Sequence, residues 1–433
     1  MAVKGMYTSE ARIQGKEVSA IAEEFGTPLF VYDADTLKST YHGLRDTLPK
    51  SADVFYSLKA NPNVSICALL NSLGAGAEVS SHAELVTALR AGVAPEDIIF
   101  LGPGKDAREL TACVEAGIHA IVCESFDELD LLDSLLATAG RDTFPVLLRV
   151  NPAFGSKGSG LAMGGKPRQF GIDEVELRES KHRLSALRHI RVKGVHAYMG
   201  TRFLNHDDVV RNTRQILATA EDLAGRLGFP LETVDFGGGL GVAYFDNEED
   251  LDLAALGTGL ADVLSSFSAH NPHCRMIMEL GRFLTAAAGT YVVRARYVKD
   301  SMGETFVVAD GGTNHHMAAV GVGSFVKRNF PIRHLGGRSV EALRPYTVTG
   351  PLCTPNDVIA KKVRLPEVQP GDLLAVERSG AYGPTASPGL FLSHGFPAEV
   401  LVHDGRAHLV RERDSTEDLL SKQHLVDFRP PAA

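Results

Sequence analysis

Eight short apolar runs alternate with amphipathic stretches between residues 36 and 285, and this alternation limits the fold more than any other feature. The stretches between the runs have helical patterns, as at Ser81–Ala91 and Ala107–Ala116. The eight predicted strands are Val54–Leu58, Ala77–Val79, Ile98–Leu101, Ala120–Cys123, Pro145–Val150, Val192–Tyr198, Thr233–Phe236 and Arg275–Glu279. Eight strand–helix units in roughly 250 residues are typical of a (β/α)8 barrel, which we predict over residues 36–285. A doubly wound sheet is the alternative, but it would not usually need eight parallel strands at this spacing.

The pattern changes after residue 285, where helical stretches become scarce and turn residues separate short β-rich runs. These runs are Thr290–Val298, Thr305–Ala309, Thr347–Thr349, Leu373–Val376 and Val400–Val402. We therefore predict a second, mainly β domain over residues 286–433. Residues 1–35, which contain the strand-like Pro28–Tyr32, are expected to join it.

Charge and cysteine usage exclude several classes of protein. The net charge is −9 and no long Lys/Arg run occurs, which argues against a nucleic-acid binder. No apolar stretch approaches about 18 residues, and the N-terminus lacks an apolar signal core, so we expect a cytoplasmic protein without a membrane span. The five cysteines are scattered and show no metal-site spacing, as expected in a reducing compartment.

A lysine, Lys59, ends the first apolar run, in the sequence FYSLKANPN. Residues at the carboxyl ends of barrel strands face the active site. Partial desolvation there is expected to lower the pKa of the lysine and make it a better amine nucleophile toward an aldehyde. Taken alone, the residue is better explained as a strand-end lysine that reaches solvent.

Two further motifs follow the seventh and eighth predicted strands. Gly237, Gly238 and Gly239 lie in VDFGGGLGV, where backbone N–H groups can approach a phosphate closely, although three glycines also suit a tight turn. Glu279 and Arg282 lie in MELGRF. A carboxylate there can pair with a protonated ring nitrogen and a guanidinium can reach a phosphate, or the two can form a surface ion pair.

The β-rich region carries two more candidates. Cys353 lies in the turn-rich GPLCTPND, where a thiol can deliver a proton if its pKa is near neutrality. Most single cysteines are simply small buried hydrophobes, which is the alternative here. Tyr382 lies in SGAYG, where its hydroxyl can bond a phosphate or its ring can pack.

These five motifs, in this order and over nearly the whole chain, resemble the fold-type III pyridoxal-phosphate (PLP) decarboxylases, the family of diaminopimelate and ornithine decarboxylases. The resemblance implies an alanine-racemase-like barrel with a β domain, working as a homodimer with shared active sites. It matches Lys59 to the Schiff-base lysine, Gly237–Gly239 to the phosphate loop, and Cys353 to a catalytic cysteine contributed by the partner subunit. It also matches Glu279 to the carboxylate on the pyridine nitrogen, and Arg282 and Tyr382 to phosphate contacts.

Departures from the family pattern reduce the range of expected substrates. In HAYMGT, Tyr198 stands where the family has a histidine stacked on the pyridine ring, and Thr201 stands at a phosphate-contacting serine position. An aromatic ring still stacks there, without a positive charge over the cofactor. Thr354 follows Cys353, where basic-amino-acid decarboxylases have an acid that meets the distal ammonium of the substrate. Losing that carboxylate disfavours lysine, ornithine and diaminopimelate as substrates.

Further stretches resemble one subgroup, the decarboxylase of butirosin biosynthesis that acts on glutamate held on an acyl-carrier protein. They are GPGK at Gly102–Lys105, MGGKPRQFGIDE at Met163–Glu174 and TNHHMAA at Thr313–Ala319, and they resemble the citryl-diaminopropionate decarboxylases of siderophore pathways less closely. A basic segment formed by Lys327, Arg328, Arg333, Arg338 and Arg344 is either a solvated loop or a docking surface for an acidic carrier protein.

The sequence therefore predicts a PLP-dependent decarboxylase of natural-product biosynthesis, with no metal ion. Its expected substrate is an acidic amino acid tethered to an acyl-carrier protein through its side-chain carboxyl. Alternatives are a decarboxylase of a free amino acid or of a citryl conjugate, a racemase on the same fold, and a non-catalytic regulator.

Overall fold

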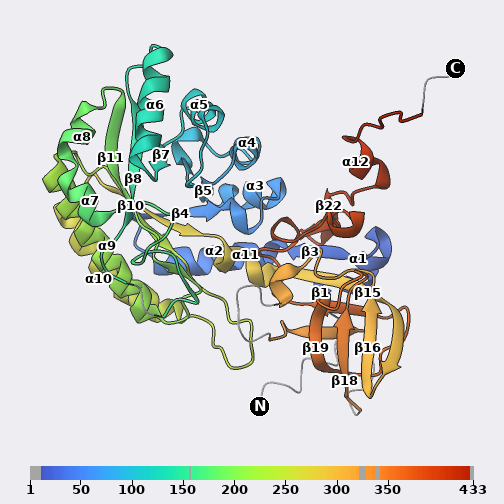
Figure 1. The fold of residues 1–433 in the computed structure, drawn as a ribbon. Helices are drawn as coiled ribbons and strands as arrows, with labels where there is room; N and C mark the ends of the chain where they lie inside the picture. The colour runs from blue at the N-terminus through green and yellow to red at the C-terminus, as the bar shows by residue number, and fades with distance from the viewer. Residues whose placement is uncertain (1–10, 156–157, 321–327, 337–341, 430–433) are drawn as a thin grey trace. The chain divides into compact units, whose positions relative to one another are not determined.

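Eight parallel strands close into a barrel in the computed structural model, which describes residues 11–155, 158–320, 328–336 and 342–429 (Figure 1). The strands are β4 Ala52–Ser57, β5 Gly76–Val79, β6 Ile98–Phe100, β7 Ala120–Cys123, β8 Phe144–Asn151, β11 Ile190–His196, β13 Thr233–Gly238 and β14 Arg275–Leu280. They pair in the order β8, β11, β13, β14, β4, β5, β6 and β7, and β7 pairs again with β8. The predicted (β/α)8 barrel and its eight strands are confirmed.

The chain divides into two compact units. The barrel unit comprises Asp33–Gly289 and Arg378–Tyr382, and the β unit comprises Met1–Tyr32, Thr290–Glu377 and Gly383–Ala433. The late segment Arg378–Tyr382 is fixed to the barrel unit by hydrogen bonds, because Tyr382 N donates to Ala60 O at 2.7 Å and Ser379 N donates to Gly289 O at 2.8 Å.

β5, β6 and β7 are fully buried, which explains why they stand out in the sequence as short apolar runs, whereas only the last three residues of β11 are buried. A core cluster fills the barrel with side chains from several strands: Phe55, Ile99, Leu101, Ala120, Val122, Leu147 and Ile277. The helices of the unit are α2 Ala34–Thr47, α3 Val64–Ser72, α4 His82–Arg90, α5 Ala107–Ala116, α6 Phe126–Thr138, α7 Glu174–Glu179, α8 Lys181–Ala186, α9 His206–Leu227, α10 Leu253–His270 and α11 Arg282–Thr285.

Three of the expected barrel strands end earlier than the sequence suggested, and one of them is β6, which ends at Phe100. β4 ends at Ser57, and Leu58–Ala60 form a 3-10 turn. This turn is held from both sides, because Tyr56 Oη donates to Asn61 O at 2.6 Å and Asn61 Nδ2 donates to Gly380 O at 3.1 Å. β11 ends at His196, so Tyr198 lies in the following loop. Lys59 and Tyr198 are therefore loop residues beyond the strand ends, not strand residues.

The β unit is built on a second sheet. Its strands are β3 Leu29–Asp33, β15 Gly289–Ser301, β16 Glu304–Ala309, β17 Ile332–Leu335, β18 Arg344–Thr349, β19 Val358–Leu365, β20 Leu373–Val376, β21 Ala398–His403 and β22 Arg406–Arg411. The main path runs β19, β18, β16, β15, β3, β21 and β22, while β20 pairs with β15 and β17. The mainly β character is confirmed, and the sequence did not indicate β17, β19 or β22.

Short elements complete the β unit. A small hairpin, β1 Arg12–Ile13 with β2 Lys16–Glu17, precedes α1 Val18–Phe25, and α12 Thr416–Leu420 follows the last strand. Among the described residues, no helix is long and apolar enough to cross a membrane.

Candidate active site

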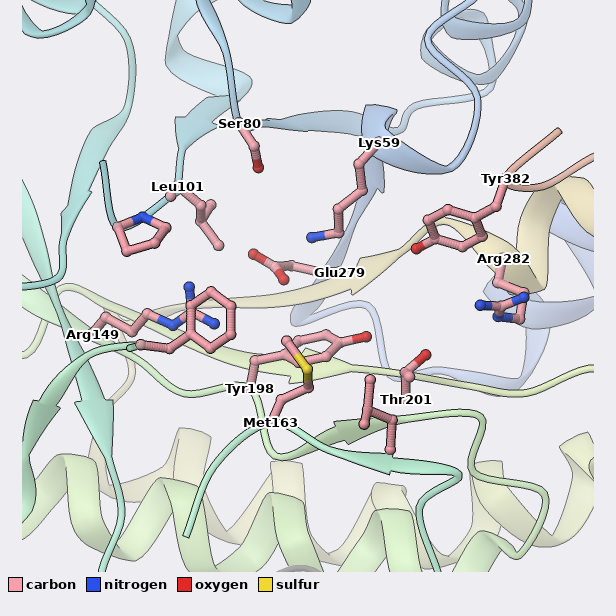
Figure 2. Close-up of a pocket in the computed structure, with 14 residues that line it drawn as sticks. Lys59, Ser80, Leu101, Arg149, Met163, Tyr198, Thr201, Glu279, Arg282 and Tyr382 are labelled. Atoms are coloured by element: carbon pink, nitrogen blue, oxygen red, sulfur yellow. The ribbon is translucent and has the colours of Figure 1, made fainter. Parts of the chain in front are cut away.

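A pocket of about 450 Å³ opens at the carboxyl ends of the barrel strands, and all 14 residues that line it belong to the barrel unit (Figure 2). Because the strands are parallel, their carboxyl ends and the loops that follow them meet at this one end of the barrel. Figure 2 shows Lys59, Glu279 and Tyr198 near the centre, with Arg282 and Tyr382 at one end and Arg149 at the other.

Lys59 extends from the 3-10 turn after β4 into the pocket and pairs with a carboxylate that the sequence analysis had not singled out. Its Nζ lies 2.9 Å from Glu78 Oε2, on β5, and the Glu78 side chain is fully buried. Ser80 Oγ donates to the other Glu78 oxygen at 2.9 Å. Burial acts to lower the pKa of Lys59, but the charges of Glu78 and Glu279 outweigh it and hold the pKa above its ordinary value. The expectation of a lowered lysine pKa was therefore wrong, because the negative neighbours are not visible in the local sequence.

Glu279 lies on β14 at the floor of the pocket and is 1% exposed. His196 Nε2 lies 3.2 Å from its Oε1. Burial opposes ionisation of Glu279, but the neighbouring His196 and Lys59 lower its pKa to about 2. Glu279 is thus an anion at neutral pH, as a partner for a protonated ring nitrogen must be.

Arg282 and Tyr382 form the opposite side of the pocket from Arg149. Arg282 Nη1 donates to Tyr244 Oη at 3.0 Å, and the guanidinium carbon lies 4.6 Å from the centre of the Tyr382 ring. Tyr382 has a backbone φ of 55°, which is uncommon for a residue with a bulky side chain and directs its ring toward Arg282 (Figure 2). These groups leave a cationic, hydrogen-bonding end to the pocket.

The three glycines after the seventh strand lie at the end of β13 and just beyond it. Gly237 and Gly239 have φ values of 67° and 71°, and side chains there would collide with neighbouring backbone oxygens. At Gly238 a Cβ would lie 2.2 Å from Glu279 O. Glycine is thus required by the packing of this loop, and the same bare backbone suits the close approach of an anion.

Tyr198 and Thr201 both line the pocket, and Tyr198 follows β11. Lys59 Nζ lies 5.7 Å from the centre of the Tyr198 ring, so a flat ring bonded to Lys59 would lie near that aromatic face. Thr201 belongs to β12 Gly200–Thr201, which pairs with β9 Leu161–Ala162. This pairing brings the segment after β8 over the pocket, where Leu161 and Met163 contribute to the wall.

The wall near Arg149 is mostly apolar. Arg149 Nη1 donates to the buried Glu124 Oε1 at 2.7 Å, and the guanidinium carbon lies 4.7 Å from the centre of the Phe170 ring. Of the 14 described residues that line the pocket, Glu279 is the one acidic side chain. This wall therefore presents apolar surface and an arginine whose charge is already paired.

Cys353 and Thr354 belong to the β unit. Cys353 is exposed, unlike the buried Cys67, Cys113 and Cys123 and the half-buried Cys274. Its loop is organised by the buried Asp357 carboxylate, which accepts hydrogen bonds from Thr313 N at 2.7 Å and Leu352 N at 2.8 Å. The roles of Cys353 and Thr354 in catalysis and substrate binding remain predictions.

Several site residues were missed in the sequence, and they share a signal that could have found them. Each is a charged or ionisable residue of a barrel strand with an apolar residue on either side of it in the sequence: Glu78 in β5, Arg149 in β8, His196 in β11 and Asp235 in β13. Charged groups are rarely buried in such strands unless they are paired or functional.

The residues of the pocket fit PLP. Lys59 supplies an amine, Glu279 a buried carboxylate, Tyr198 an aromatic face, and Arg282 with the glycine loop an anion-binding end. Two buried atoms at this site, Arg282 Nε and Glu279 Oε2, have no hydrogen-bond partner among the described residues. A phosphate and a protonated pyridine nitrogen would satisfy them.

A closed parallel barrel with this set of groups at its carboxyl end defines a PLP-binding enzyme of the alanine-racemase-like kind. A family model described as pyridoxal-dependent decarboxylase, pyridoxal binding domain, matches residues 34–286. The chain belongs to the pyridoxal-dependent decarboxylases, and its cofactor is PLP.

Individual relatives agree with this class. The chain is 37% identical over 413 residues to the L-glutamyl-(BtrI acyl-carrier protein) decarboxylase of Niallia circulans, covering 94% of this chain and 96% of the relative. It is 31% identical to the diaminopimelate decarboxylase of Aquifex aeolicus, covering 94% of each chain. The solved structure of diaminopimelate decarboxylase from M. jannaschii with L-lysine is similar, with a TM-score of 0.87, 26% identity and coverage of 98% and 97%. The chain is thus a PLP-dependent amino acid decarboxylase.

Proposed function

We propose that this enzyme decarboxylates an acidic amino acid held through its side-chain carboxyl on an acyl-carrier protein, in natural-product biosynthesis. The observation that carries the proposal is Thr354, a neutral residue directly after Cys353, where the family resemblance places an acid for a distal ammonium. The relative from Niallia circulans, named for L-glutamyl on a carrier protein, supports the same substrate class.

The lining of the pocket supports a neutral distal group on the substrate. The wall formed by Leu101, Leu161, Met163 and Phe170 is apolar, and Arg149 is paired with Glu124. A distal ammonium would meet no unassigned carboxylate among the described lining residues, and leaving such a charge unpaired costs several kcal/mol. A thioester or amide carries no charge there, so the wall tolerates it.

The barrel residues are assigned as follows in the proposal. PLP, when bound, supplies an electron sink for the electron pair left on the α-carbon when CO2 departs. Lys59 holds the cofactor, Glu279 keeps a negative charge at the ring nitrogen, and Tyr198 covers a face of the ring. Arg282, Thr201, Tyr382 and the Gly237–Gly239 loop bind the phosphate. Their distances and burial are compatible with these roles.

In the proposal, Cys353 returns a proton to the α-carbon of the substrate. The enzyme is a homodimer in this proposal, and the Cys353 of each subunit acts at the active site of its partner. The exposure of Cys353 in the β unit is compatible with this role. Mixing inactive Lys59→Ala and Cys353→Ala protomers tests the arrangement, because one intact hybrid site should form per heterodimer. If verified heterodimers recover no activity, both residues serve the site of a single chain.

The carrier-protein docking surface is assigned to the basic segment that begins at Lys327. Lys327 and Arg338 lie outside the described residues. Arg328 and Arg344 are exposed, whereas Arg333 is only partly exposed. We therefore assign docking to Arg328 and Arg344 in preference to Arg333, together with Lys327 as the sequence predicts, and we expect binding to weaken as salt is added.

The test is to incubate the enzyme with glutamyl- or aspartyl-loaded carrier protein and to weigh the loaded arm by mass spectrometry. Decarboxylation removes about 44 Da, the mass of CO2. Equal or faster turnover of free glutamate, diaminopimelate or a citryl-diaminopropionate conjugate would reject the tethered substrate. Charge-neutral variants Lys327→Gln and Arg328→Gln should raise KM for the loaded carrier, while Arg406→Gln, on β22, serves as the matched control.

A further inference from the structure

Three ionisable side chains meet beneath the pocket, one from each of three adjacent barrel strands. They are His196 on β11, Asp235 on β13 and Glu279 on β14, and His196 is paired in register with Asp235. All three are 0–1% exposed, and one ligand atom from each lies within 4.8 Å of the others. Such a group cannot carry two full negative charges in a buried site without a compensating proton or cation.

Two buried carboxyl groups with ligand oxygens within 4.8 Å of each other cannot both be ionised without a large cost, so we expect one of them to carry a proton. The geometry gives the proton to Asp235. Burial and the charge of Glu279 raise the pKa of Asp235 well above its ordinary value, and the more distant Glu78 adds to the effect. Glu279 instead faces His196 and Lys59, so it stays ionised.

Asp235 also reaches the other end of the cofactor site. Its Oδ1 accepts a hydrogen bond from Gly237 N at 2.8 Å, and Gly237 is the first residue of the glycine loop. Its Oδ2 is buried without an ordinary hydrogen-bond partner among the described residues, as expected if this oxygen carries the proton and faces a second carboxyl group. One side chain thus connects the glycine loop with Glu279.

We propose that Asp235 is a neutral positioning residue, whose carboxyl group donates a hydrogen bond to Glu279 and accepts one from Gly237 N. The inference rests on the proposed assignment of Glu279 to the ring nitrogen of PLP. His196 Nε2 lies 3.2 Å from Glu279 Oε1 and also favours the ionised form of Glu279. With Asp235 and His196 beside it, Glu279 remains a weaker base than the pyridine nitrogen, so the proton between them stays on the ring.

The decisive variant is Asp235→Asn, because an amide keeps both hydrogen bonds and matches the charge of a protonated carboxyl group. We expect PLP to bind to Asp235→Asn with a dissociation constant within about threefold of that of the wild type. Asp235→Ala loses both bonds, and its dissociation constant is expected to rise about 10- to 100-fold. Nitrogen-15 NMR of PLP labelled at the ring nitrogen should show a protonated ring in the wild type and Asp235→Asn, and partial loss of that proton in Asp235→Ala.

Infrared difference spectra give a readout that needs neither substrate nor turnover. The wild type at neutral pH should show the C=O stretching band of a protonated carboxyl group that is absent in Asp235→Asn. This comparison still decides the question if Asp235→Ala does not fold. Absence of that band, or loss of ring protonation in Asp235→Asn, would show that Asp235 is ionised and overturn the proposal. A stoichiometric metal ion in the purified enzyme would overturn it as well.

Failure of the underlying assignment would look different. If Glu279→Gln leaves the ring nitrogen protonated, Glu279 is not its partner, while the infrared band of Asp235 would be unaffected by that result. Failure of the carrier-protein substrate changes neither the NMR nor the infrared measurement.

Discussion

Removing the charge of Glu78 should change how readily Lys59 reacts with PLP. Lys59 Nζ and Glu78 Oε2 are 2.9 Å apart, and the carboxylate is fully buried. At an effective dielectric constant of about 20, Coulomb's law gives roughly 6 kcal/mol for this separation. The Lys59 side chain is 39% exposed, so solvent screens the pair and the value measured for charged hydrogen bonds, about 1.5–3 kcal/mol, is the better guide.

The variant Glu78→Gln keeps the shape of the side chain and removes its charge. We expect the pKa of Lys59 to fall, because burial lowers it and one of the two opposing carboxylates is gone. At a fixed pH below the pKa of Lys59 in both proteins, the neutral fraction of the Lys59 amine should be about 10- to 100-fold higher in Glu78→Gln than in the wild type. The neutral amine is the form that attacks the aldehyde of PLP.

The assay follows the rate at which PLP-free enzyme takes up PLP across a pH series, by the absorbance of the bound cofactor. Glu78→Gln should be faster than the wild type at neutral pH, and its rate should level off at a lower pH. Asp53→Asn is the matched control, since Asp53 lies at the start of β4, the strand that precedes Lys59, and pairs with Arg275. An unchanged pH profile in Glu78→Gln would refute the argument that this carboxylate sets the pKa of Lys59.

Four further outcomes are expected. Borohydride reduction and peptide mapping should place the pyridoxyl group on Lys59, and a label on another lysine would reject that assignment. The variant Cys353→Ala should lower turnover by a factor of roughly 10²–10⁴ while PLP stays bound. Asp357→Ala should destabilise the β unit by about 1–3 kcal/mol and speed alkylation of Cys353, because it removes the acceptor of the loop hydrogen bonds, and unchanged values for both would contradict this. His316 is buried, and burial lowers its pKa from 6.5 to about 3. Between these two pH values the unfolded chain binds a proton at His316 that the folded chain does not bind, so the free energy of unfolding falls as the pH drops from about 6.5 to about 3. Denaturant unfolding should be measured at pH 7 and pH 5. Between these two pH values, the free energy of unfolding of His316→Phe should fall by about 2 kcal/mol less than that of the wild type.

The barrel was predictable because the parallel strands other than β11 are buried along most of their length, so these strands leave largely apolar runs in the sequence. β5 and β7, for example, have no exposed residue. Two of the three strands missed in the β unit have the opposite character. β19 mixes buried and exposed residues, β22 has no buried residue, and both carry basic residues, so neither shows a long apolar run.

The sequence by itself determined the chemistry that the chain carries, since Lys59, the glycine loop, Glu279 and Arg282 each stand in a short local motif. Tertiary structure alone decided which charges face one another. Glu78, His196 and Asp235 come from separate strands and converge only because the barrel closes, and their electrostatic effects act through space rather than along the chain. For this reason local sequence predicted a lowered pKa for Lys59, whereas the folded barrel surrounds that lysine with carboxylates that raise it.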